Sequence, residues 1–149
     1  MKQLGYLNLV SNFEANRTIK IEAVVIPANK TILKTERLLI LDTGADNTAF
    51  TREFLKKSGY GIYTKSGNKK RTVTGEVELL TCEINGITIA NQFKFSKMKV
   101  DVLENWKSYT VVGVIGMDII SQMTFVLSHK HKKFMLTNQD ISNLEKLFD

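Results

Sequence analysis

The chain of 149 residues is 43% hydrophobic and 24% charged, which suits one ordinary domain spanning residues 1–149 and excludes both disorder and a pair of domains. Lysine and arginine exceed aspartate and glutamate by 21 − 15 = 6, a mild basic excess that by itself assigns no acidic partner. A lone cysteine, no signal-peptide pattern and no apolar run near the roughly 18 residues of a membrane span predict a cytoplasmic protein without disulfides or membrane insertion.

The first third of the chain predicts two strands and a helix. Residues 18–25 alternate between apolar and polar side chains before Pro27, which indicates a strand followed by a turn. Residues 35–41 end in four consecutive apolar residues, as expected for a strand that enters a core covered on both faces. This second strand places Asp42 at its end. Residues 51–57 predict a short helix, which the Ser-Gly pair that follows would stop.

The middle of the chain predicts two hairpins. Residues 62–73 are polar and read as a hairpin around Ser66-Gly67-Asn68. Residues 76–95 read as a second hairpin that turns at Asn85-Gly86, the strongest two-residue hairpin signal in the chain. Both hairpins are candidates for exposed edges.

The last third predicts more strands and two helical segments. Residues 111–115 read as a buried strand, and residues 118–122 as one or two helical turns. Residues 124–127 and 133–136 are expected to pair as strands, and residues 140–148 carry apolar side chains at helical spacing. Many short strands with one or two short helices and a C-terminal helix indicate a mainly β, barrel-like domain.

The residues that carry chemistry are Asp42-Thr43-Gly44, directly after an apolar strand. An ionisable carboxylate at the point where the chain leaves a core is a candidate functional group. Gly44 allows a sharp turn and the close approach of another chain, and the Thr43 hydroxyl can hold the loop by a hydrogen bond. Because Asp and Gly are also common turn residues, the tripeptide gains its meaning from the rest of the sequence.

A second glycine-containing element lies some seventy residues after Asp42. It runs from Val112 to Ile120 and contains Ile115-Gly116-Met117-Asp118. The order apolar-apolar-Asp-Thr-Gly-Ala-Asp, a glycine-bearing hairpin and then apolar-Ile-Gly-x-Asp resembles the retropepsin family, the single-domain aspartic proteases of retroviruses and their bacterial relatives. The resemblance covers residues 18–136, and residues 41–48 are especially similar to the retroviral active-site loop.

This resemblance implies a mainly β, closed-barrel-like retropepsin fold and an aspartic-type endopeptidase. Asp42 matches the catalytic aspartate, with Thr43 and Gly44 beside it in the catalytic motif, and the threonine of the family bridges to the other subunit. The hairpin around Gly67 would be a flap over the substrate, with Gly75 as a second placement of its tip. The residues that the family implies for substrate binding are Ala45, Asp46, Asn47, Ser66, Gly67, Asn68 and Ile115.

Two departures from the retroviral pattern concern Met117 and the C-terminus. Met117 stands where retroviral enzymes carry an arginine that pairs with the aspartate matching Asp46, whereas bacterial relatives look similar to this chain there. Beyond Leu136 the chain continues towards a predicted helix, where retroviral subunits end in a strand of the dimer sheet. The resemblance therefore implies a dimer contact that is rebuilt.

Peptide hydrolysis by this class requires two carboxylates around one water. The chain holds a single Asp-Thr-Gly, so the second carboxylate is expected from Asp42 of a symmetry mate, which predicts a two-fold homodimer. The substrate is a polypeptide, and neither a metal nor another cofactor is required. Activity is expected to peak at acidic to near-neutral pH.

Two other classes of function compete with this prediction. One is a peptide-binding or assembly module that keeps the retropepsin fold without turnover. The other is a basic nucleic-acid-binding β-domain, which rests on the charge of residues 65–71 and 129–133 alone; these clusters read better as solvated hairpin tips. Cys82 is expected to be a buried structural cysteine, and the pair His129 and His131 offers too few ligands for a metal.

Overall fold

The computed structural model describes residues 6–12, 18–72, 75–106, 108 and 110–138, and it confirms the mainly β fold class. In chain order the elements are β1 (Tyr6–Asn12), β2 (Lys20–Val25), β3 (Glu36–Leu41), β4 (Ala49–Thr51), α1 (Arg52–Lys57), β5 (Thr64–Thr72), β6 (Gly75–Ile84), β7 (Ile87–Ile89), β8 (Phe93–Phe95), β9 (Met98–Leu103), β10 (Val111–Ile115), α2 (Met117–Ile120), β11 (Thr124–Ser128) and β12 (Lys133–Thr137). No helix among the described residues is long and apolar enough to cross a bilayer.

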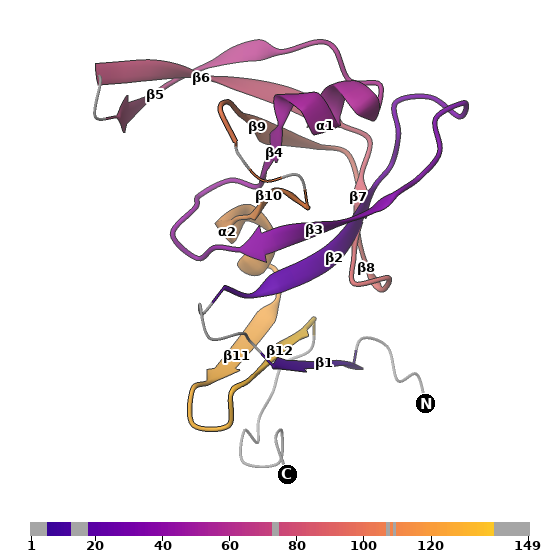
Figure 1. The fold of residues 1–149 in the computed structure, drawn as a ribbon, viewed down its shortest axis with the longest axis vertical. Helices are drawn as coiled ribbons and strands as arrows, with labels where there is room; N and C mark the ends of the chain where they lie inside the picture. The colour runs from indigo at the N-terminus through magenta and orange to yellow at the C-terminus, as the bar shows by residue number, and fades with distance from the viewer. Residues whose placement is uncertain (1–5, 13–17, 73–74, 107, 109, 139–149) are drawn as a thin grey trace.

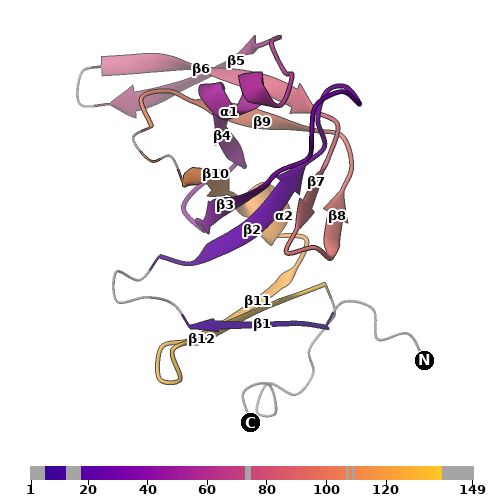
Figure 2. The same cartoon turned by 45° about the vertical axis from the view of Figure 1, so that its right-hand side comes forward.

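The strands form two sheets (Figure 1). The larger sheet has nine strands in the order β5-β6-β9-β4-β10-β3-β2-β7-β8, and the smaller has three in the order β1-β12-β11. Figures 1 and 2 place the small sheet at one end of the molecule and the hairpin β5–β6 at the other. The expected closed barrel is not confirmed, because neither sheet closes on itself and the large sheet is open at β5 and β8.

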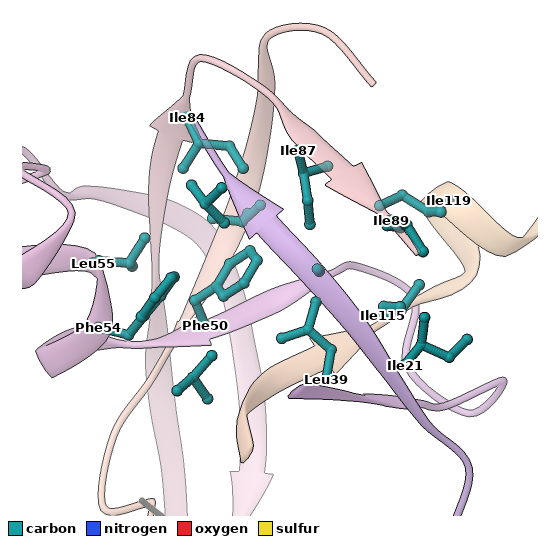
Figure 3. Close-up of a cluster of buried hydrophobic side chains, with 14 of the residues drawn as sticks. Ile21, Leu39, Phe50, Phe54, Leu55, Ile84, Ile87, Ile89, Ile115 and Ile119 are labelled. Atoms are coloured by element: carbon teal, nitrogen blue, oxygen red, sulfur yellow. The ribbon is translucent and has the colours of Figure 1, made fainter. Parts of the chain in front are cut away.

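The core lies between the strands of the large sheet and the two helices. Ile21, Ala23 and Val25 of β2 are buried in alternation, as the sequence pattern predicted. Figure 3 shows Leu39, Phe50 and other buried side chains converging on one cluster. The rings of Phe50 and Phe54 stack with their centroids 5.4 Å apart, which joins α1 to this cluster. Burying a side chain such as Leu39 stabilises the fold by about 1.5–3 kcal/mol.

The neighbours of β10 determine where the candidate site lies. β10 pairs in parallel with β3, with Ile115 opposite Leu41, and in antiparallel fashion with β4, with Gly113 opposite Phe50. Because β10 lies between β3 and β4, it runs directly beneath the loop that connects them. The end of β3, where Asp42 follows, and the end of β10, where Gly116 follows, therefore meet.

Most of the predicted elements are confirmed, namely the strands at 18–25, 35–41 and 111–115, the pair at 124–127 and 133–136, and the helical turns at 118–122. The helix predicted at 51–57 begins at Arg52, because Thr51 is its N-cap and accepts a hydrogen bond from Phe54 N at 3.2 Å. The predicted helix at 140–148 lies outside the described residues.

The prediction of a hairpin turn at Ser66-Gly67-Asn68 is wrong. These residues lie within β5, which continues to Thr72 and pairs with β6 so that Thr72 is opposite Gly75. Gly67 has a φ of +77°, and the register shifts between Lys65 and Lys69, so the glycine serves an irregularity within the strand. The pairing therefore continues past Gly67 to Thr72 and Gly75, which agrees with the second placement, at Gly75.

The hairpin predicted at Asn85-Gly86 is also wrong. β6 pairs with β5 and β9, whereas β7 pairs with β2 and β8. A Cβ on Gly86 would lie 2.8 Å from the carbonyl oxygen of Phe95 and 2.9 Å from the Ile26 side chain. Gly86 permits this close approach because it has no side chain. The chain turns a corner there from β6 into β7, and these two strands do not pair with each other.

Candidate active site

The loop of residues 42–48 connects β3 to β4 and carries the predicted catalytic aspartate. Asp42 N donates to Ile115 O at 3.0 Å, which fixes the start of the loop on β10. The Asp42 carboxylate accepts a hydrogen bond from Gly44 N at 2.9 Å, and Ala45 N donates to Asp42 O at 3.2 Å. The loop therefore turns tightly around Asp42, while Asp42, Thr43 and Gly44 all remain exposed.

Two glycines allow close backbone contacts here: Gly113 of β10 faces β4, and Gly116, directly after β10, faces the loop. A Cβ on Gly113 would lie 2.0 Å from Ala49 O, and one on Gly116 would lie 2.4 Å from the carbonyl carbon of Asn47. Neither distance can accommodate a side chain, since the contacting atoms belong to the backbone. Gly113 therefore brings β10 into direct contact with β4, and Gly116 brings the chain after β10 into direct contact with the loop.

Thr48 and Asp118 form a hydrogen-bonded link between the loop and α2. Thr48 N lies 3.0 Å from each Asp118 carboxylate oxygen, and the Thr48 hydroxyl donates to Oδ1 at 2.7 Å. Gly116 N donates to the same hydroxyl oxygen at 3.1 Å, and Ile119 N donates to Asp118 Oδ1 at 2.8 Å. Thr48 is fully buried and Asp118 is half-buried, so the link that sets the end of the loop is partly shielded from water.

Backbone hydrogen bonds complete the attachment of the loop to α2. Met117 N donates to Ala45 O at 2.7 Å, and Asp118 N donates to Asp46 O at 3.1 Å. Sequence reasoning missed the positioning roles of Thr48 and Asp118. The available signal was Asp118, an acidic residue at the start of a helix that follows a glycine. Its hydrogen-bond partner Thr48 lies 70 positions away in the sequence.

The structure gathers some of the predicted site residues and separates others. Asp42 to Asn47 lie on the one loop, and Asp46 forms no ion pair with any residue that the structure describes. Ile115 lies at the end of β10 with its side chain 0% exposed in this chain, and its contact with substrate remains a prediction. The segment Ser66-Gly67-Asn68 lies within β5 and away from the hairpin tip. Its contact with substrate remains a prediction.

Asp42 and Thr43 border an open depression between β3 and β11. Its volume is about 270 Å³, and its lining residues are Thr18, Ile19, Ile40, Leu41, Asp42, Thr43, Phe125 and Leu127. Asp42 is the one ionisable residue among them. Within the described part of the chain, no group of three or more His, Cys, Asp or Glu residues could hold a metal ion. The depression therefore presents a single carboxylate on a largely apolar surface.

Cys82 does not belong to this site. It is buried in β6, and burial raises the pKa of its thiol above the usual range. A raised pKa keeps the thiol protonated at neutral pH, and a protonated thiol is a poor nucleophile. The chemistry of the site therefore centres on Asp42.

Comparison with known proteins adds three findings. A family model described as aspartyl protease matches residues 20–119. A retropepsin-like aspartic protease from Rickettsia conorii has a similar structure, with a TM-score of 0.61 and 18% identity over 86% of this chain and 96% of that one. EIAV protease, solved with the inhibitor HBY-793, gives a TM-score of 0.53 and 19% identity over 74% of this chain and 92% of that one.

A search of curated proteins finds no match. At identities this low, the two structural likenesses show a shared fold and do not by themselves assign an activity. The family model covers the stretch from β2 to α2, which includes the whole loop around Asp42 and the glycines of β10.

Proposed function

The chain belongs to the aspartyl protease family, and from this premise we propose that it is an aspartic endopeptidase in which Asp42 residues from two subunits activate one water. The observation that carries the proposal is the position of Asp42, exposed on a tightly held loop above β10. One carboxylate oxygen accepts from Gly44 N, which leaves the other oxygen open towards the solvent. We place the whole chain in one domain and in the cytoplasm.

The reaction requires one ionised and one protonated carboxylate. The ionised Asp42 takes a proton from the water, whose oxygen attacks the peptide carbonyl, while the protonated Asp42 of the other subunit hydrogen-bonds to the carbonyl oxygen. The tetrahedral intermediate collapses when the leaving nitrogen gains a proton. Two neighbouring carboxylates share one proton readily, because ionising both is unfavourable. This sharing supplies the two states that the reaction needs.

The second carboxylate is expected from another chain, because the sequence holds a single Asp-Thr-Gly and Asp42 is the one acid among the described residues that line the depression. The same depression is lined by Phe125 and Leu127 of β11, and β11 is the outer strand of the three-stranded sheet. In the described part of the chain, β11 pairs on one side only, with β12. An edge strand can accept a further strand, and two-fold symmetry would place the partner's β11 antiparallel to it. We therefore assign the dimer contact to β11.

Leu127 offers a test of this contact, since it is 40% exposed on β11 beside the depression. Leu127→Lys would bring two cations together across the two-fold axis, and we expect the dimer dissociation constant to rise at least about tenfold. Leu33→Lys is the matched control, because Leu33 is 85% exposed, lies on the segment between β2 and β3, and does not line the depression. Sedimentation velocity measures both, and equal behaviour of the two variants would place the contact elsewhere.

The hairpin β5–β6 is proposed as a flap that closes over the peptide. Figures 1 and 2 show it projecting from the molecule on the side where the loop between β3 and β4 lies. A peptide-like inhibitor with a tetrahedral hydroxyl should slow hydrogen exchange in β5 and β6 and beside Asp42. Unchanged exchange in the hairpin at saturating inhibitor would identify it as an ordinary surface hairpin.

The catalytic assignment is tested by Asp42→Asn in a peptide-library cleavage assay. The amide keeps the volume of the side chain but can neither ionise nor share a proton, so we expect turnover to be abolished. Glu53→Gln on α1 is the matched control and should keep wild-type activity. Peptide binding without cleavage by the wild-type protein would favour the non-catalytic binding module instead.

A further inference from the structure

A hollow lies at the opposite end of β3 from Asp42. It has a volume of about 270 Å³ and lies between α1, the start of β10 and the segment that connects β2 to β3. We call it the Arg37 pocket, and the residues that line it include Val25, Ile32, Leu33, Arg37, Phe54 and Val112. No predicted catalytic or substrate-binding residue lines it, so its role is separate from that of the loop around Asp42.

The Arg37 pocket has an apolar floor and a mixed rim, where Leu33 lies among exposed polar residues such as Thr35, Lys57 and Ser108. Val25, Phe54 and Val112 are buried, with exposed fractions of 4%, 7% and 7%, and they form a fixed floor. Leu33 is 85% exposed at the rim. Covering an exposed leucine side chain with an apolar group is favourable, so the exposed Leu33 favours a partly apolar occupant.

Arg37 provides a cation at the mouth of this apolar hollow. In the β2–β3 ladder Arg37 lies opposite Ala23, and Leu39, two residues further along, lies opposite Ile21. Ala23 and Leu39 are buried, so Arg37 continues the face of the sheet that points to the core. Arg37 itself is exposed and lies at the end of this face, where it lines the hollow.

No described residue pairs with the Arg37 guanidinium by a hydrogen bond or an ion pair. The neighbouring acids Glu22 and Glu36 lie on the other face of the ladder, where a hydrogen bond between their side chains raises the pKa of Glu22. Glu53, the one acid that lines the pocket, lies 3.0 Å from Lys57 in an ion pair. By contrast, Arg52 pairs with Glu104 and lies over the Tyr63 ring. Arg37 therefore offers unused donors.

We propose that the Arg37 pocket binds a small amphipathic carboxylate. Its aliphatic part would contact Val25, Phe54 and Val112, and its carboxylate would accept paired hydrogen bonds from the Arg37 guanidinium. The volume lies just below the range of sites for drug-sized ligands, which fits a group the size of a branched amino acid or a medium-chain fatty acid. The shared chemistry can come from the C-terminal leucine of a peptide or from a free fatty acid.

The walls of the pocket connect this site to α1. Ala28 N donates to Ser58 O at 2.9 Å, which ties the connecting segment to the C-cap of α1. A Cβ on Gly59 would lie 2.6 Å from Ile32 Cδ1, so Ile32 packs closely against the chain that follows α1. A ligand held between Arg37 and Phe54 would therefore stabilise the position of α1, and its binding can be measured without reference to catalysis.

The test is a titration of ¹⁵N-labelled protein with N-acetyl-leucine, octanoate and the uncharged N-acetyl-leucinamide. Amide shifts are expected at Ile32, Leu33 and Phe54, with N-acetyl-leucine at least about tenfold tighter than its amide. Arg37→Gln should abolish the difference between acid and amide. Lys34→Gln, which removes a nearby exposed cation that does not line the pocket, should leave it intact. Unchanged spectra elsewhere show that each variant is folded.

The same titration distinguishes the two ligand sources, and it can also give results that overturn the proposal. Tighter binding of octanoate assigns the pocket to fatty acids, and tighter binding of N-acetyl-leucine assigns it to peptide C-termini. Equal binding of acid and amide, equal weakening by Arg37→Gln and Lys34→Gln, or shifts confined to the loop around Asp42 would each overturn the proposal. None of these results depends on proteolytic activity, so they leave the proposed function to its own test.

Discussion

The loop around Asp42 and the hairpin β5–β6 are held by different kinds of interaction. The loop rests on a backbone contact with Gly116 and on a hydrogen-bonded link between the buried Thr48 and the half-buried Asp118. The ion pairs that the structure describes within the hairpin are exposed, Lys65 with Glu78 at 3.5 Å and Lys69 with Glu76 at 3.7 Å. Buried contacts hold one geometry, whereas exposed ion pairs contribute little and allow motion. The comparison therefore assigns fixed chemistry to the loop and movement to the hairpin.

The largest expected effect comes from Gly116→Ala. The added Cβ would lie 2.4 Å from backbone carbon and 2.6 Å from backbone oxygen of Asn47, so the loop must shift. We expect a loss of about 3 kcal/mol or more in the free energy of unfolding, at the upper end for overpacked sites. Gly61→Ala is the control, because nothing lies within 4 Å of its Cβ position. Urea unfolding of both variants measures the difference, and similar stabilities would contradict the close contact.

A smaller loss is expected from Thr48→Val. The change keeps the shape of the side chain but removes the hydroxyl that donates to Asp118 and accepts from Gly116 N. Gly116 N would lose its buried acceptor, while Asp118 would keep its bonds from Thr48 N and Ile119 N, so we expect the free energy of unfolding to fall by about 1–3 kcal/mol and cleavage to fall through a misplaced loop. Thr64→Val on the exposed hairpin should change stability by no more than about 0.5 kcal/mol. If the two threonine variants unfold at the same urea concentration, the buried link is not what holds the loop.

Removing the hairpin ion pairs should have less effect still. In the double variant Lys65→Gln and Lys69→Gln we expect a loss of less than about 1 kcal/mol, because all four partners are exposed. Added salt should remove most of the difference from wild type. Hydrogen exchange should remain faster in the hairpin than in β10 in both proteins. A hairpin that exchanges as slowly as β10 would contradict its assignment as the mobile region.

The smallest effect concerns Cys82, where the hairpin joins the core. Burial raises the pKa of the thiol in the folded protein, so the unfolded chain loses this proton at a lower pH. The stabilisation is therefore complete below the unfolded pKa of about 8.5 and is lost as the pH rises from there towards the folded pKa. Cys82→Ala should be less stable overall but show a shallower decline in alkaline solution. An identical alkaline slope in thermal melts would exclude this contribution.

The sequence was informative where local pattern and tertiary structure agree. The apolar runs before Asp42 and Gly116 predicted β3 and β10. β10 is mostly buried, but β3 is not covered on both faces as expected, because only Leu39 is buried and Ile40 and Leu41 line the open depression. The hairpin tip was misplaced because a glycine with positive φ suits an irregular strand as well as a turn, and Gly67 takes the former role. The link between Thr48 and Asp118 depends on residues brought together by folding, which no local pattern records. β4 and β8 are three residues each, too short for a periodic signal.

The central claim, that two Asp42 carboxylates act together, is tested most directly by mixing wild-type protein with Asp42→Asn at constant total concentration. If subunits exchange freely and activity requires two aspartates, an equal mixture should retain about one quarter of the wild-type cleavage rate, because about one dimer in four has both. Activity that falls in proportion to the wild-type fraction, to about one half in the equal mixture, would show that each chain works alone and would contradict the paired mechanism.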